Sequence, residues 1–127
     1  YERKMIMESK NIAVLAANAL NSKKAVQLKV LKVEELTVLA EYFVIATATS
    51  STHVRALADE VEEVLEKNGV RPHHIEGKTT GWIVLDYSGV IVHIFTPDQR
   101  EFYSLDRIWS DAEEINLDKI LTEATGD

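Results

Sequence analysis

GWIVLDYSGVIVHIF, residues Gly81 to Phe95, reads as two strands joined by a tight turn. Ser88-Gly89 is the predicted two-residue turn, because glycine tolerates the positive φ that such turns require. Side chains alternate along a strand, so the turn fixes which residues share a face. One face carries the pairs Tyr87–Val90, Leu85–Val92 and Ile83–Ile94. This face is aliphatic apart from one tyrosine, so it is predicted to lie on the core.

The opposite face of the hairpin mixes aromatic, aliphatic and polar side chains. Its pairs are Asp86–Ile91, Val84–His93 and Trp82–Phe95. Complete burial would make Asp86 and His93 costly, whereas a fully solvated face would carry Lys, Thr and Glu. The mixture is typical of an interface core with polar anchors. The alternative is that a helix covers this face and Asp86 is satisfied locally.

Asp86 and His93 also invite interpretation as a catalytic pair. They sit diagonally across the two strands, at the outer limit of side-chain contact. An Asp can orient a His base, but a nucleophile must then lie beyond the His. No Ser or Thr lies on that face, so no catalytic residue is predicted here.

The segments upstream of the hairpin alternate between helix and strand. Apolar residues recur at helical spacing from Glu8 to about Asn21 and from Ser50 to Asn68. The stretch 25–30 alternates like a half-buried strand, and 41–48 is apolar enough for a central strand covered on both faces. We therefore predict an α/β (α+β) domain, with a mixed sheet of about five strands and helices packed on it.

The segments next to and beyond the hairpin are shorter. "HHIEG" reads as a short strand before it, and "DQREFY" and "LDRIW" as helical turns after Pro97. "DAEEINLDKIL" is either a terminal helix or a loosely docked tail. We assign residues 8–117 to a single domain, 1–7 to an N-terminal extension and 118–127 to a C-terminal tail.

Composition narrows the functional classes. The 127 residues contain no cysteine, which excludes disulfides and zinc-thiolate sites. Fourteen basic and 21 acidic residues give a net charge of -7, which disfavours direct nucleic-acid binding and suits a basic partner. No apolar run approaches the ~20 residues that cross a bilayer, so no membrane association is expected.

Three further stretches carry candidate sites. His73, His74 and Glu76 could hold zinc only with a third protein ligand, since adjacent strand residues face opposite ways; no metal is predicted. The segment from Thr47 to His53 could hold a phosphate at a helix N-terminus, but it lacks the glycine that allows close backbone approach. Arg100 and Tyr103 are residue types enriched at binding hot spots, with a salt-bridged surface turn as the alternative.

Three long motifs together resemble the Iojap/ribosomal silencing factor family. They are "EYFVIATATSSTHVRALADEVEE", "EGKTTGWIVLDYSGVIVHIF" and "REFYSLDRIW", in the family's order, and the resemblance covers roughly Ile12 to Ala112. It implies a nucleotidyltransferase-like fold without that superfamily's catalytic residues. It also implies docking on a basic protein of the large ribosomal subunit, number fourteen, which blocks joining to the small subunit. Homodimers are common in the family.

The resemblance and the hairpin analysis together give one partner-binding set. Its members are Trp82, Val84, Asp86, His93, Phe95, Arg100 and Tyr103, with Leu105 and Trp109 nearby. Ala48 stands where the family usually has Gly, which argues further against a phosphate cradle.

The leading hypothesis is a non-enzymatic, cytoplasmic protein that represses translation by blocking ribosomal subunit joining, without a cofactor. The alternative is a nucleotide- or phosphate-binding enzyme of nucleotidyltransferase type at Thr47 to His53. Nucleotidyl transfer needs paired carboxylates that hold metal ions. No Asp-x-Asp or Glu-x-Glu motif follows that segment, which disfavours the enzyme.

Overall fold

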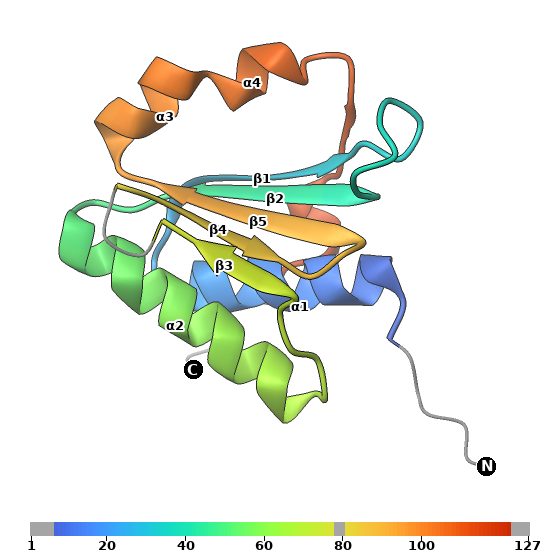
Figure 1. The fold of residues 1–127 in the computed structure, drawn as a ribbon, viewed down its shortest axis with the longest axis horizontal. Helices are drawn as coiled ribbons and strands as arrows, with labels where there is room; N and C mark the ends of the chain where they lie inside the picture. Colours follow the sequence, from blue (N-terminus) through green and yellow to red (C-terminus); the bar gives the residue numbers. More distant parts are fainter. Residues whose placement is uncertain (1–6, 78–80, 123–127) are drawn as a thin grey trace.

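The computed structural model describes residues 7–77 and 81–122, which form a layered arrangement around one sheet (Figure 1). The helices are α1 (Ser9–Ser22), α2 (Ser51–Lys67), α3 (Pro97–Tyr103), α4 (Leu105–Ile108) and the 3-10 turn η1 (Leu117–Lys119). The strands are β1 (Val26–Lys32), β2 (Tyr42–Thr47), β3 (His74–Glu76), β4 (Trp82–Asp86), β5 (Val90–Phe95) and β6 (Glu113–Glu114). None of these helices is long and apolar enough to cross a membrane.

The sheet has the strand order β3-β4-β5-β2-β1-β6 and is mixed, as predicted. The β2–β5 pair is parallel, and every other pair in the described sheet is antiparallel. The expected number of strands was about five; the sixth is β6, a two-residue strand that pairs with the end of β1. A strand of two residues is too short to show a period in the sequence.

The hairpin register is the one predicted from the turn. Trp82 pairs with Phe95, Val84 with His93, and Asp86 with Ile91, and the Tyr87 amide donates to the Val90 carbonyl at 2.8 Å. The positive φ that was expected of glycine lies instead at Ser88, at 73°, and Gly89 does not have one. The aliphatic face lies in the main core, as expected.

The main core lies between the sheet and the two long helices, on the lower face in Figure 1. α1 and α2 have the predicted apolar stripes. The Ser50 hydroxyl caps α2 by accepting from the His53 amide at 3.1 Å, and Gly69 ends the helix with a φ of 82°. β2 is buried at all six positions, as expected for a central strand.

A second, smaller cluster lies on the other face of the sheet, beneath α3 and α4 (Figure 1). β1, β2 and β5 contribute buried side chains, and Leu105 and Trp109 pack against them. This layer covers the β1–β2–β5 part of the face.

The segment after α4 is neither a terminal helix nor a loose tail. The Ile115 amide donates to the Val30 carbonyl at 2.8 Å. The Asn18 amide group donates to the Ile120 carbonyl at 2.9 Å and accepts from the Thr122 amide at 2.7 Å. The chain therefore packs against α1 as far as Thr122, beyond the assigned boundary at 117. Residues 1–6 and 123–127 of the assigned extension and tail lie outside the described residues.

Candidate protein-binding face

Four hairpin side chains remain partly exposed on the face that carries α3 and α4. We call Trp82, Val84, Asp86 and Ile91 the open sheet face; each is of intermediate exposure. They lie on β4 and β5, beside the part of the sheet that the short helices cover. The open sheet face is therefore a mixed aromatic, aliphatic and acidic surface.

Trp82 lies at the centre of an aromatic cluster. Its ring stacks on Phe95 with centroids 4.9 Å apart and contacts Tyr103 of α3 at 4.3 Å. Its indole Nε1 donates a hydrogen bond to His93 Nδ1 at 3.2 Å. The Trp82 ring is thus held by neighbours from β5 and α3 while part of it stays accessible.

His93 is one of the buried polar residues of the domain, with 8% of its surface exposed. Its ring and that of Phe43 form a T-shaped pair, with centroids 5.2 Å apart. Burial lowers the pKa of His93 from 6.5 to about 4, because an apolar environment disfavours the charged imidazolium. His93 is therefore neutral at pH 7.

Asp86 and His93 do not form a catalytic pair in this geometry. His93 Nδ1 accepts from Trp82, and Asp86 Oδ1 accepts from the Ser88 amide at 2.8 Å. Each group has its own local partner, so Asp86 does not orient the imidazole.

Three of the seven predicted partner-binding residues are buried. Phe95 is 0% exposed, Arg100 7% and His93 8%, whereas Tyr103 is 39% exposed. The reason is that α3 and α4 fold back over this end of the sheet. The alternative of a covering helix is thus correct for part of the face.

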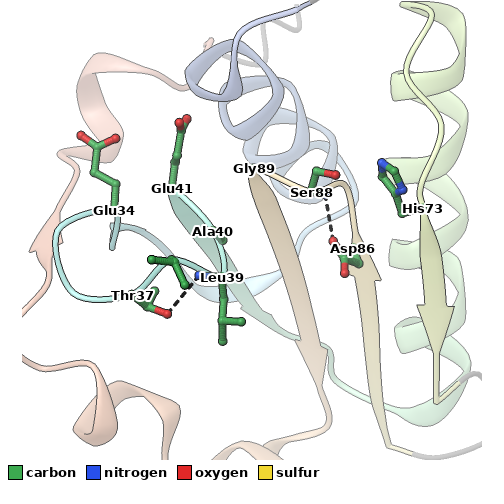
Figure 2. A pocket seen from close by; sticks show the side chains of 10 residues that line it. Glu34, Thr37, Leu39, Ala40, Glu41, His73, Asp86, Ser88 and Gly89 are labelled. Atoms are coloured by element: carbon green, nitrogen blue, oxygen red, sulfur yellow. Dashed lines mark hydrogen bonds between the residues drawn. The ribbon is translucent and has the colours of Figure 1, made fainter.

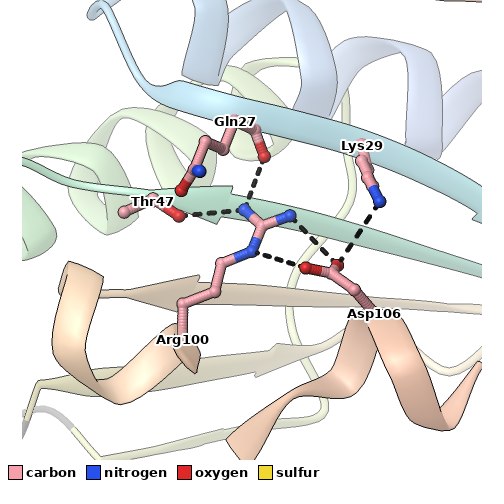
Figure 3. A network of polar contacts seen from close by, with 5 residues as sticks. All are labelled: Gln27, Lys29, Thr47, Arg100 and Asp106. Carbon is pink, nitrogen blue, oxygen red and sulfur yellow. Dashed lines mark hydrogen bonds and ion pairs between the residues drawn. The ribbon is translucent and has the colours of Figure 1, made fainter. Parts of the chain in front are cut away.

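Arg100 holds this covering layer in place (Figure 3). Its guanidinium forms a bidentate ion pair with Asp106, with both N–O distances at 3.1 Å. It also donates to the Gln27 carbonyl and to the Thr47 hydroxyl, the latter at 2.9 Å. Lys29 Nζ lies 3.8 Å from Asp106. Arg100 therefore joins α3 and α4 to β1 and β2, and a direct contact with a partner is not its role in this conformation.

An acidic recess adjoins the Asp86 end of the open sheet face (Figure 2). It is a depression of about 710 Å³ between the β1–β2 loop, the β4–β5 turn and the start of β3. Its lining residues are Glu34, Thr37, Val38, Leu39, Ala40, Glu41, His73, Asp86, Ser88 and Gly89, with no lysine or arginine among them.

Charge and apolar exposure coincide in the acidic recess. Glu34 pairs with Lys32 at 3.4 Å, but no ion pair joins Glu41 or Asp86 to a cation within residues 7–77 and 81–122. Val38 and Leu39, at the tip of the loop, are 102% and 68% exposed. The recess therefore presents uncompensated carboxylates beside two projecting aliphatic side chains.

The loop residues of this recess carry no sequence motif that marks them as a site. A turn is present at residues 33–36 of this loop, where the Leu36 amide donates to the Val33 carbonyl at 2.8 Å. No periodic signal separates an exposed aliphatic pair in a loop from a buried one.

Several polar groups of the Thr47 to His53 segment bond to other groups of the domain. The Thr47 hydroxyl accepts from Arg100, and the Thr49 amide donates to His53 Nδ1 at 2.9 Å. His53 Nε2 donates to the Lys23 carbonyl at 2.8 Å. These groups connect the β2–α2 turn to the α1–β1 turn, so they are not directed at a phosphate.

His74 and Glu76 do converge, as their alternate positions predict. His74 Nε2 lies 2.6 Å from Glu76 Oε2 on the exposed edge strand. Within the part of the chain that the structure describes, no three His, Cys, Asp or Glu side chains are grouped as metal ligands.

The fold is that of a known class of small α+β proteins. A crystal structure of a protein from Chromobacterium violaceum matches it with a TM-score of 0.80 and 29% sequence identity. The match covers 94% of this chain and 98% of that one.

Sequence comparison identifies the family. The profile described as "Ribosomal silencing factor during starvation" matches residues 6–127. A ribosomal silencing factor RsfS of Halalkalibacterium halodurans is 31% identical over 117 residues, which span 91% of this chain and 100% of that protein. A Bacillus subtilis protein of the same name is 34% identical over 113 residues, spanning 88% and 96%. This chain belongs to the ribosomal silencing factor family, which confirms the resemblance found in its motifs.

Proposed function

We propose that this protein binds the large ribosomal subunit through a basic ribosomal protein, number fourteen, and represses translation by blocking subunit joining. The observation that carries the proposal is the open sheet face with the acidic recess beside it. The chain's membership of the ribosomal silencing factor family supports the same function. The mechanism requires only affinity and steric bulk. A cytoplasmic location follows from it for a bacterial protein.

The apolar part of the open sheet face supplies the anchor. Trp82 is partly exposed but fixed on two sides by Phe95 and Tyr103. A pre-oriented aromatic ring loses little entropy on binding, and tryptophan is enriched among interface hot spots. Val84 and Ile91 extend the apolar surface beside it.

The acidic recess supplies charge complementarity to a basic partner. Glu41 and Asp86 carry negative charge that no described cation neutralises, next to the exposed Val38 and Leu39. A partner's lysine or arginine could place its charge by the carboxylates and its methylene stem on the aliphatic pair. Such pairing favours rapid and oriented association.

An enzymatic role has no comparable support. The buried histidine bonds to Trp82, and the Thr47 hydroxyl and the Thr49 amide of the Thr47 to His53 segment bond within the domain. The relatives from Halalkalibacterium halodurans and Bacillus subtilis are described as ribosomal silencing factors.

The test is co-sedimentation of the purified protein with isolated bacterial 50S subunits, with 30S subunits as the control. We expect stoichiometric pelleting with 50S subunits, and inhibition of 70S formation in a light-scattering assay. Trp82→Ala is expected to weaken 50S binding by about 2 kcal/mol or more. Absence of wild-type binding at low salt would refute the proposal.

A second copy of the chain is a competing occupant of the same face. If the open sheet face mediates a homodimer, dimerisation and 50S binding exclude each other. Sedimentation equilibrium of wild type and of Trp82→Ala measures this: a dimer that the substitution dissociates would place the dimer interface on the open sheet face.

A further inference from the structure

His93 belongs to the predicted partner-binding set, yet its side chain is more than nine-tenths buried. It cannot touch a partner unless the aromatic cluster opens. We infer that His93 is a positioning residue, which holds the Trp82 indole in the orientation used for docking. The inference rests on the proposed function, in which Trp82 is the anchor.

Ring contacts and a hydrogen bond from the described residues act on the Trp82 ring. Phe95 stacks against it at 4.9 Å and Tyr103 packs at 4.3 Å, but ring contacts alone allow an aromatic side chain to slide or turn over. The hydrogen bond from Nε1 to His93 Nδ1, at 3.2 Å, acts on one edge of the indole. It therefore selects one of the two ring orientations that differ by a flip.

The protonation state of His93 suits it to accept this bond. Because Nδ1 accepts, the single proton of the neutral imidazole lies on Nε2. Nε2 is buried and has no hydrogen-bond partner within residues 7–77 and 81–122. The low pKa keeps the ring neutral well below pH 7, so the acceptor persists under ordinary conditions.

The unsatisfied Nε2 indicates a functional reason for the imidazole. A buried polar atom without a partner destabilises the folded state, and an aliphatic side chain would fit this apolar cluster without that cost. The neighbours of His93 are mainly apolar: Phe43 at the ring edge, Phe95 at 6.2 Å and Val84 across the strand. What the imidazole offers over leucine at this position is the hydrogen bond to Trp82.

The first experiment follows the Trp82 indole N–H by two-dimensional NMR, and it needs no ribosome. We expect slow hydrogen exchange in wild type and fast exchange in His93→Leu. His93→Asn is the conservative variant, since its side-chain oxygen occupies roughly the place of Nδ1, and slow exchange should return. An indole N–H equally protected in His93→Leu would overturn the inference. His93→Phe serves as a second acceptor-free variant if the leucine variant does not fold.

The second experiment is a double-mutant cycle on binding to 50S subunits. His93→Leu should weaken binding by about fivefold, the equivalent of one hydrogen bond, and His93→Asn should restore it. Trp82→Phe removes the donor but keeps an aromatic ring, so His93→Leu should have no further effect in that background. Equal loss in both backgrounds would mean that His93 acts independently of the indole, and would refute positioning.

The two experiments separate the inference from the proposed function. Failure of the wild-type protein to bind 50S subunits refutes the proposed function, and with it the docking role of Trp82. If the wild-type protein binds 50S subunits but indole exchange is unchanged in His93→Leu, only the positioning role of His93 is refuted.

Discussion

Lowering the pH from 7 to 4 is expected to destabilise the folded protein through His93. Burial lowers the pKa of this imidazole from 6.5 to about 4, so between these values the unfolded chain binds a proton that the folded protein does not. The free energy of unfolding therefore falls as the pH decreases through this interval, and the full value is retained above pH 6.5. At about 1.4 kcal/mol per pH unit, the loss reaches about 3 kcal/mol near pH 4.

A loss of this size is a large part of the stability of an ordinary domain, which is about 5–15 kcal/mol. Urea denaturation at a series of pH values measures it directly. With an m-value of about 2 kcal/mol/M, the urea midpoint should move by about 1.5 M. The largest change is expected between pH 6 and pH 4.5.

Carboxylates also titrate at the lower end of this range, so the control must remove His93 alone. His93→Asn retains an acceptor for Trp82 but has no proton to gain. The difference in pH dependence between wild type and His93→Asn isolates the histidine. If the two proteins lose stability in parallel from pH 6.5 to pH 4, then burial of a neutral His93 is not the cause.

Three other outcomes are expected. Arg100→Gln should lower the free energy of unfolding by about 2 kcal/mol, because it removes a buried cation whose carboxylate partner is one-third exposed. Urea denaturation measures this loss. As a control, Arg107→Gln at an exposed position should change the free energy of unfolding by less than about 0.5 kcal/mol. Asp86→Lys should weaken 50S binding, most strongly at low salt. Asp59→Lys should not weaken it, because α2 packs on the other face of the sheet. Equal effects would argue against a role of the acidic recess in binding. Nucleotide with magnesium should leave the melting temperature unchanged, and a rise that depends on the Thr47 to His53 segment would support the phosphate site instead.

The aromatic cluster around Trp82 has an accessible side and a buried side. Trp82 and Tyr103 are partly exposed and form its accessible side, whereas Phe95 and His93 are buried beneath. On the inference above, the buried His93 sets the orientation of the Trp82 ring. A change at His93 is thus expected to affect binding without removing a contact.

Local sequence was sufficient for the hairpin. The Ser88-Gly89 turn sets the register, and period-two alternation then assigns every side chain of β4 and β5 to a face; all five pairs in that ladder formed as predicted. The long helices were predictable for the same reason, since the apolar stripe, the Ser50 cap and the Gly69 stop are all local. The mixed sheet followed from the order of the elements.

The family, too, was readable from the sequence, because its motifs are long and occur in order. The aromatic and acidic residues of the hairpin were visible as candidates for binding. Their alternation placed them on one face, but it could not tell how much of that face is open.

Only the tertiary structure decided which candidates are accessible. α3 and α4 are short segments whose position depends on Arg100, which reaches Gln27 and Thr47 across more than fifty residues of sequence. The acidic recess likewise combines residues from the β1–β2 loop and the β4–β5 turn. The sequence by itself determined the hairpin, the long helices and the side chains that share a face, because turns and periodicity act between neighbours. Exposure depends on segments that meet only after folding, so the division of these side chains into buried supports and open contacts was decided by the tertiary structure.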